Sequence, residues 1–276
     1  MARRREPDII LSQDGMTPFF LPLALPAWNL PAMPFLPLTG GFGVFTNIDK
    51  GAGLSLDFSQ IHQLSEDSML EQVLERLLWL GHSSFIYEGD SLIYFDPFAL
   101  HRLRPADIIL VGHDHPHHCS PADIDKVRRE HTVILADEHA VKHIAPPAIA
   151  MAPGQQETVD DFLIEAVPAY NLHTSFHPKR KAYLGFIVTL AGLRLYHAGD
   201  TDFIPEMHDL DVDIALLPIS GFTVMNAEEA AQAALALHPQ VAIPMHYGTA
   251  YGTLEDAERF RALLDHKIRV EILAKS

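Results

Sequence analysis

The chain has 276 residues, is 48% hydrophobic and carries a formal net charge of −16, so it can bury the core of one large domain or of two fused halves. The acidic balance argues against a protein that binds nucleic acid through its phosphates, because such binding depends on Lys and Arg. The single cysteine, Cys119, excludes an internal disulfide framework and a Cys-rich zinc site. A reducing cytoplasm is therefore the expected location, and any metal ion must be held by His and carboxylate groups.

Residues 1–65 are expected to form an N-terminal extension. Its apolar stretch, residues 19–38, contains five prolines, which would break the helix that a membrane span or a signal peptide requires. We therefore expect an extended segment packed on or near the active-site mouth, where Phe19, Phe20, Trp28 and Phe35 would wall an apolar pocket. A membrane-surface contact is the alternative for this segment.

From residue 66 the pattern becomes regular and predicts an α/β domain over residues 66–276. Residues 66–75 have the spacing of a short amphipathic helix, and two strands within residues 83–97 meet at a tight Gly89-Asp90 turn. Further strands are predicted at residues 107–111, 132–136, 162–167, 183–190, 193–198, 213–219, 241–245 and 269–273. Helices are predicted at residues 121–131, 227–238 and 254–266. This order suggests two α/β halves packed face to face.

Polar side chains gather where several of these strands end. The stretch VGHDHPHHCSPADI places His113, His115, His117 and His118 directly after an apolar strand. His177, Asp200 and His246 lie beside other strand ends, which is where α/β proteins place their ligand sites. Imidazole and carboxylate together suit zinc, iron or manganese, and so many ligands can hold two ions with a bridging water.

The sequences of these motifs resemble those of a known family. HDHPHH is similar to the H-x-H-x-D-H signature of the metallo-β-lactamase superfamily, and FHPK, AGDT and PMHYG follow in that superfamily's order. Residues 76–250 look like the branch of metal-dependent hydrolases that includes the L-ascorbate-6-phosphate lactonase and the N-acylphosphatidylethanolamine phospholipase D relatives. The resemblance implies a four-layer αββα sandwich and one or two divalent metal ions, with zinc first and manganese or iron as alternatives.

The resemblance also implies a ligand set. The first ion would bind His113, His115 and His177, the second would bind His118 and His246, and Asp200 would bridge the two. His177 is preferred over His173 as the third ligand of the first ion, because the HPK sequence at His177 matches the family motif better.

One position departs from the signature, because His117 stands where the family has aspartate. An imidazole there can still coordinate the second ion, but it brings no negative charge, so the site becomes more electropositive or holds that ion more weakly.

Neighbouring residues are expected to play supporting roles. His82 and Asp96 are interpreted as structural, and the Asp96 carboxylate is placed to hold a ligand histidine by its other ring nitrogen. Asp114 is expected to face away from the ions, and Cys119 is expected to fill a buried space.

The functional hypothesis is a metal-dependent hydrolase in which an activated water attacks an ester, lactone, amide or phosphodiester bond. His117, Asp200 and His246 are the candidate catalytic residues, with His117 or the second ion stabilising the oxyanion or leaving group. The substrate would be a small molecule, anionic or with an apolar tail, and the basic HPKRK stretch (residues 177–181) is a candidate anion contact. A nuclease of the same fold, a redox di-iron protein and a non-catalytic metal-binding module are the alternatives.

Overall fold

The computed structural model describes residues 58–249 and 251–276. The apolar stretch 19–38, with its predicted wall of aromatic side chains, lies outside the described residues, so its packing at the active-site mouth stays a prediction. The predicted boundary between residues 65 and 66 likewise stays a prediction.

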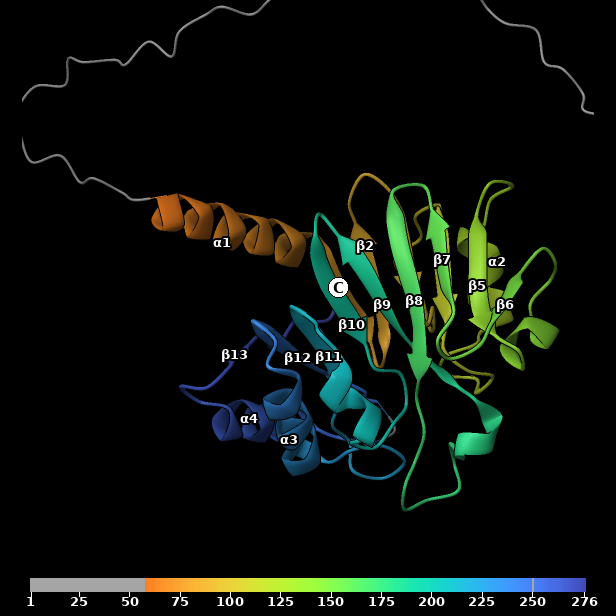
Figure 1. Ribbon diagram of the computed structural model, residues 1–276. Coiled ribbons are helices and arrows are strands. Elements are labelled where there is room, and N and C mark those ends of the chain that lie inside the picture. Colours follow the sequence, from red (N-terminus) through yellow and green to blue (C-terminus); the bar gives the residue numbers. More distant parts are fainter. Residues whose placement is uncertain (1–57, 250) are drawn as a thin grey trace, which may run out of the picture. The chain divides into compact units, whose positions relative to one another are not determined.

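Two sheets face each other in the described part of the chain (Figure 1). The first sheet contains, in spatial order, β1 (Leu77–Gly81), β2 (Ser84–Glu88), β3 (Leu92–Phe95), β4 (Ile108–Val111), β5 (Val133–Asp137) and β6 (Ile149–Met151). The second contains β13 (Arg269–Val270), β12 (Val241–Met245), β11 (Ile214–Pro218), β10 (Leu193–His197), β9 (Leu184–Leu190), β8 (Phe162–Pro168) and β7 (Gln156–Val159). The helices are α1 (Phe58–Arg76), α2 (Pro121–Val127), α3 (Ala227–Leu237) and α4 (Leu254–Leu263), with short 3₁₀ turns at Ala140–His143, Lys179–Lys181 and Pro205–Asp209.

Each sheet has an antiparallel part and a parallel part. Strands β3 to β6 run parallel in the first sheet, and strands β10 to β13 run parallel in the second. Parallel neighbours end at the same edge of a sheet, so the loops that follow β3 and β4 lie together, as do those that follow β10, β11 and β12. The parallel parts of the two sheets therefore bring together loops that carry predicted histidines and Asp200.

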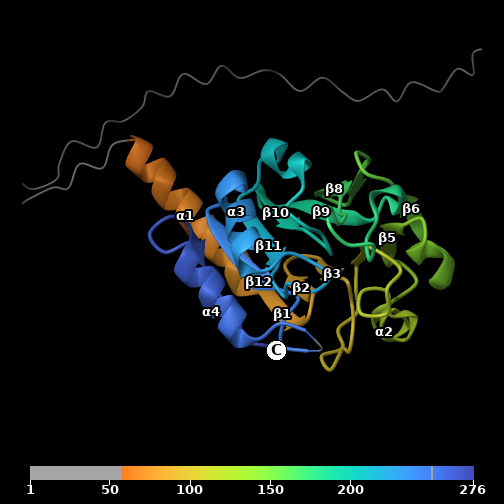
Figure 2. The same ribbon diagram turned by 90° about the horizontal axis from the view of Figure 1, so that it is seen from below.

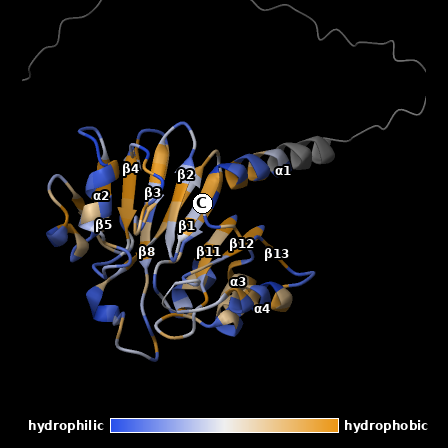
Figure 3. Cartoon of the chain, turned by 180° about the vertical axis from the view of Figure 1, so that it is seen from behind, coloured by the Kyte–Doolittle hydropathy of each residue, from blue (hydrophilic) through white to orange (hydrophobic). Residues whose placement is uncertain are grey.

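The strands alternate their buried side chains between two cores, as the period of two in a strand requires. Phe85, Phe95 and Leu110 belong to the large core that the two sheets share. Ile86 and Ile109 point the other way, into a second core that includes Ile124 and Val127 of α2. Figure 3 shows the strands mostly in hydrophobic colours and α2 mostly in hydrophilic ones.

Helices cover the outer faces of both sheets. Helix α2 packs on the first sheet, where Ile124 and Val127 share a core with Ile134 of β5. In Figure 2, α3 and α4 lie beside β11 and β12 of the second sheet. Buried alanines on α3, among them Ala230 and Ala234, belong to the large core, which lets this helix approach its sheet closely. The predicted four-layer αββα arrangement is confirmed. Within the described part of the chain, no helix combines the length and the apolar character needed to cross a bilayer.

Side chains cap the starts of α2 and α3. Ser120 caps α2 by accepting a hydrogen bond from the Asp123 N–H, and Asn226 and Glu229 form a reciprocal capping box at α3. The prediction for α2 was too long, because the helix ends at Val127 and the following residues turn toward β5.

Three strands and one helix start escaped prediction. Strand β1 follows α1 without a break, so the apolar residues of β1 look like a continuation of the helical pattern. The helix α1 itself begins at Phe58 rather than at residue 66. Strands β6 and β7 are mostly exposed and lack the alternation of a half-buried strand. In α1, Leu70 and Val73 are buried, whereas Met69 is exposed.

Core packing at β4 should dominate the stability of this fold. Leu110 is fully buried between the sheets, so Leu110→Ala should lower the free energy of unfolding by about 2–5 kcal/mol. Urea unfolding of the metal-free protein, followed by circular dichroism, measures the change. Leu103→Ala is the matched control, because Leu103 is 54% exposed and its loss should cost less than about 0.5 kcal/mol. Equal losses for the two variants would contradict this packing.

Candidate metal centre

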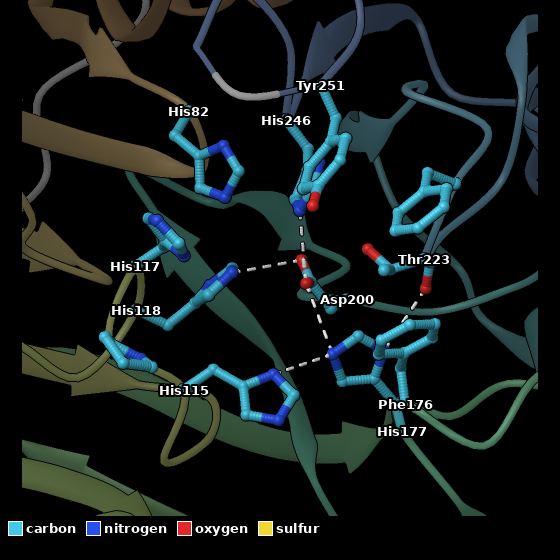
Figure 4. Close-up of a pocket in the computed structure, with 12 residues that line it drawn as sticks. His82, His115, His117, His118, Phe176, His177, Asp200, Thr223, His246 and Tyr251 are labelled. Carbon is cyan, nitrogen blue, oxygen red and sulfur yellow. Dashed lines mark hydrogen bonds and ion pairs between the residues drawn. The ribbon is translucent and has the colours of Figure 1, made fainter.

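Five loops at the strand ends bring histidine and aspartate side chains to one pocket. His82 follows β1, His113 to His118 follow β4, His177 lies in the loop after β8, Asp200 follows β10 and His246 follows β12. The pocket has a volume of about 170 Å³. Figure 4 shows Asp200 among imidazoles, with Phe176 and Tyr251 on the side opposite His117.

Asp200 is the electrostatic centre of this pocket. One carboxylate oxygen, Oδ2, lies 3.2 Å from His246 Nε2, 3.4 Å from His177 Nε2 and 3.9 Å from His113 Nε2. The other, Oδ1, lies 3.2 Å from His118 Nε2. One buried carboxylate therefore faces imidazoles from both sheets.

Among the described residues, the potential ligand atoms fall into three overlapping groups, each within 4.8 Å. The first is His113, His115 and His177; the second is His82, His118 and His246; the third is His113, His118 and Asp200. The third group joins the other two, as expected for two neighbouring ion sites with one shared carboxylate.

The loop after β4 sends its histidines in different directions. His113 and His115, two residues apart, meet His177, and His115 Nδ1 lies 3.1 Å from His177 Nε2. His118 instead faces the other carboxylate oxygen of Asp200, Oδ1, at 3.2 Å. His117 lines the pocket but is exposed and belongs to none of the three groups. His173 is exposed on its loop and is likewise outside them.

The ring nitrogens that point away from the centre have partners. His118 Nδ1 lies 2.7 Å from Asp96 Oδ2, His177 Nδ1 lies 3.0 Å from Asn171 Oδ1, and His246 Nδ1 lies 2.9 Å from Ser220 Oγ. Asp96 thus contacts a candidate ligand histidine, as expected from the sequence. Asn171 Oδ1 is an acceptor, which places the proton of neutral His177 on Nδ1 and leaves its Nε2 lone pair facing inward.

Burial keeps most of these imidazoles neutral. It holds the pKa of His113 well below the usual range and lowers the pKa of His177 to about 4 and that of His82 to about 2. Burial also opposes charge on His118, but the Asp200 and Asp96 carboxylates outweigh it and raise the pKa of His118 to about 10. Burial likewise disfavours the Asp200 carboxylate, but His118 and His246 hold its pKa well below the usual range.

The donor set fits divalent metal ions. His113 Nε2 is buried and has no hydrogen-bond partner, although buried polar atoms are almost always paired, and buried Asp200 Oδ1 has only the 3.2 Å ion-pair contact with His118 Nε2. Neutral imidazoles and one carboxylate are the ligands that zinc, manganese and iron accept, and a cation would satisfy both atoms at once.

Comparison with known proteins agrees with this chemistry. A family profile described as a β-lactamase superfamily domain matches residues 76–246. A UPF0173 metal-dependent hydrolase of Thermococcus kodakarensis is 35% identical over 221 residues, which cover 72% of this chain and 96% of the relative. This chain belongs to the metallo-β-lactamase superfamily.

Solved structures place it among the superfamily's metal-dependent hydrolases. A protein described as a metal-dependent hydrolase from Parabacteroides distasonis has a TM-score of 0.66 and 35% identity, over 71% of this chain and 91% of that one. Igni18, a metallo hydrolase of Ignicoccus hospitalis, has a TM-score of 0.61 and 25% identity, over 72% of this chain and 95% of that one. The expected fold and enzyme class are confirmed.

Three residues at the candidate metal centre adopt unusual backbone angles. His82, Asp96 and His246 have φ values of 54°, 44° and 60°, a left-handed region that non-glycine residues rarely occupy. Gly112 permits another close approach: a Cβ there would lie 2.5 Å from the Leu184 carbonyl oxygen. The sequence gives no direct signal for these angles, although His82 shares with His113 the pattern of an apolar strand followed by histidine.

The remaining expectations concern neighbours of the centre. Asp114 accepts a hydrogen bond from the Tyr183 hydroxyl at 2.6 Å, away from the ligand groups, as expected. Cys119 is buried, also as expected, and burial raises the pKa of its thiol to about 12. In the basic stretch, Lys179 pairs with Glu206 at 2.8 Å, which reduces its value as an anion contact.

The Asp96 carboxylate should tune metal affinity without being a ligand. Asp96→Asn keeps the side-chain size but removes the charge beside His118, so affinity for Zn²⁺ should fall about 10–100-fold. Competition with a chromophoric chelator measures it. Asp137→Asn is the matched control, since Asp137 is a fully buried aspartate that bonds only backbone N–H groups of His139 and Ala140. Unchanged affinity in Asp96→Asn would show that this contact does not orient His118.

Proposed function

We propose that the protein hydrolyses a small-molecule ester, lactone, amide or phosphodiester at a centre of two divalent ions, with zinc preferred. The observation that carries the proposal is the Asp200 carboxylate, whose Oδ2 faces His113, His177 and His246 and whose Oδ1 faces His118. The first ion would bind His113, His115 and His177. The second would bind His118 and His246, and Asp200 would be shared.

When bound, divalent ions act as Lewis acids and supply a water activated near neutral pH. The residues of the chain prepare the site for this chemistry. Asp200 balances part of the positive charge, and Asp96, Asn171 and Ser220 fix the orientation of the ligand rings. His117, an exposed residue that lines the pocket, would exchange a proton with the leaving group of the substrate.

A side-chain nucleophile is not needed for this reaction. Cys119 is buried, and the raised pKa of its thiol keeps it protonated at neutral pH, so it is no candidate nucleophile. The net charge of −16 also disfavours the nuclease alternative, because a nucleic acid would be repelled.

The pocket rim supports a substrate with an apolar group. Phe176, Phe222 and Tyr251 line the pocket and are about half exposed, and the Phe222 ring lies 5.7 Å from Phe176 and 4.6 Å from Tyr251, centre to centre. Such an aromatic wall beside the ion centre suits an acyl or aryl group. The proposed kinship with the lactonase and phospholipase D branch makes phosphate-bearing esters and lactones the first substrates to test.

Removal of one central ligand should abolish hydrolysis. His113→Ala deletes a buried imidazole of the first ligand group, so the variant should lose Zn²⁺ and at least about 1,000-fold in kcat/KM on any ester, lactone or phosphodiester that the parent cleaves. Elemental analysis and turnover assays measure both. His266→Ala is the matched control, because this side chain is 92% exposed, belongs to none of the ligand groups and does not line the pocket.

Two results would refute the proposed function. A parent protein purified without chelators that holds no transition metal would contradict the ion centre. Hydrolysis that survives His113→Ala at the parent rate would contradict its role in the reaction. Iron-dependent colour with redox turnover would instead indicate the di-iron alternative, and a metal-bound protein that turns over no substrate of the panel would indicate a binding module.

The aromatic wall should affect substrate binding more than the chemical step. Phe222→Ala removes a half-exposed ring, so KM for substrates with an apolar chain or ring should rise about 10-fold, while kcat changes little. Steady-state kinetics on a series of esters with increasing chain length tests this. Leu254→Ala serves as the control, since Leu254 is as exposed but does not line the pocket. An equal KM increase on short polar substrates would argue against an apolar subsite.

A further inference from the structure

The second ion site has an unexpected histidine beside it. The resemblance assigns this site His118, His246 and, in place of the signature aspartate, His117. The geometry instead brings His82 within reach: the ligand atoms of His82, His118 and His246 lie within 4.8 Å of one another. Ligands that share one zinc ion at about 2.1 Å lie at most about 4.2 Å apart, so only small side-chain movements are needed.

His82 is held firmly against His246. Its ring centre lies 3.9 Å from that of His246 and 5.3 Å from that of His118. Its carbonyl oxygen accepts hydrogen bonds from the His246 N–H at 2.8 Å and from the Trp79 indole N–H at 2.9 Å. The bond from His246 connects the loop after β1 in one sheet to the loop after β12 in the other, and the bond from Trp79 anchors the same carbonyl to β1, so the positions of the two imidazoles relative to each other are fixed.

The His82 ring is also oriented. Thr249 Oγ1 lies 3.0 Å from His82 Nδ1, in the way that Ser220 contacts His246 and Asp96 contacts His118. In all three rings the Nδ1 atom has a partner, which directs Nε2 toward the centre. His82 is buried and has a positive φ, a strained conformation that persists only where the surrounding structure imposes it.

His117 has none of these features. It is exposed, it belongs to no ligand group among the described residues, and its ring packs 5.0 Å from Phe98 and 5.4 Å from His82. Figure 4 shows His82 and His117 as separate rings on the same side of the pocket. The imidazole that occupies the sequence position of the signature aspartate is therefore not the one that reaches the ligand group.

We infer that His82 is a ligand of the second ion and that His117 is not. The inference rests on the proposed two-ion function and deepens it. The second site then has three imidazoles, with Asp200 as the carboxylate that both ions share. This centre carries one negative charge fewer than one built on the H-x-H-x-D-H signature, which favours anionic groups on the substrate.

Metal titration of matched histidine variants tests the inference. His82→Asn removes the imidazole while keeping a residue that tolerates positive φ, and His117→Ala removes the other ring. Metal-free parent and variants are titrated with Co²⁺, whose visible absorption reports the number and type of ligands, and the stoichiometry is checked by elemental analysis. Thermal unfolding of the metal-free proteins confirms that both variants are folded.

We expect two bound ions in the parent and in His117→Ala. We expect His82→Asn to keep the first ion and to lose affinity for the second by more than the roughly 10–100-fold that loss of an outer hydrogen bond costs. The absorption of the second Co²⁺ should change in His82→Asn alone. Thr249→Val, which removes only the hydroxyl beside His82 Nδ1, should weaken the second ion less and leave its spectrum unchanged.

Three outcomes would overturn the inference. Two ions bound by His82→Asn with parental affinity and spectrum would exclude His82 as a ligand. Loss of the second ion in His117→Ala but not in His82→Asn would restore the signature position. A parent that binds one ion, unaffected by His82→Asn, would remove the second site while leaving single-ion hydrolysis possible, whereas a parent that binds no ion would refute the proposed function itself.

Discussion

The structure depends on one buried carboxylate that is surrounded by imidazoles. Asp200 lies at the end of β10 and is 4% exposed, so its charge would be costly without compensation. His118 compensates it in the metal-free chain, since the Asp200 and Asp96 carboxylates raise the pKa of this imidazole to about 10. A divalent ion in place of the His118 proton would also compensate the Asp200 carboxylate, with two positive charges instead of one. The candidate ligand groups thus surround the Asp200 carboxylate, a charge that the fold buries even without a metal ion.

The two-sheet architecture is what makes this burial possible. The loops after β1 and β4 come from one sheet, and those after β8, β10 and β12 come from the other. Contacts across the interface fix their relation: the Gly112 carbonyl accepts the Leu184 N–H at 2.9 Å, and His197 Nε2 lies 2.8 Å from the Ser83 carbonyl oxygen. Each contact joins the sheets close to a ligand loop, so core packing and site geometry are coupled.

Much of the fold was predictable because its signals are local. The hairpin of β2 and β3, strand β4 and the capped start of α3 all follow from alternation, turn residues and capping residues within a few positions. Strands β6 and β7 were missed because their pairing comes from neighbours in the sheet rather than from a pattern of their own. The same distinction applies to the site. The cluster from His113 to His118 is visible in the sequence, whereas the position of His82 depends on β1 lying beside the loop after β12.

The sequence alone determined the chemistry available to this protein: many histidines and few carboxylates at strand ends, one cysteine, and motifs in the order of the superfamily to which the chain belongs. These properties are carried by residue identity and spacing along the chain. The tertiary structure decided which imidazoles share a centre. His82 and His246 are far apart in sequence, and a backbone hydrogen bond between loops of opposite sheets brings them together. His117, next to His118 in sequence, lies outside the ligand groups because successive residues of a loop point in different directions.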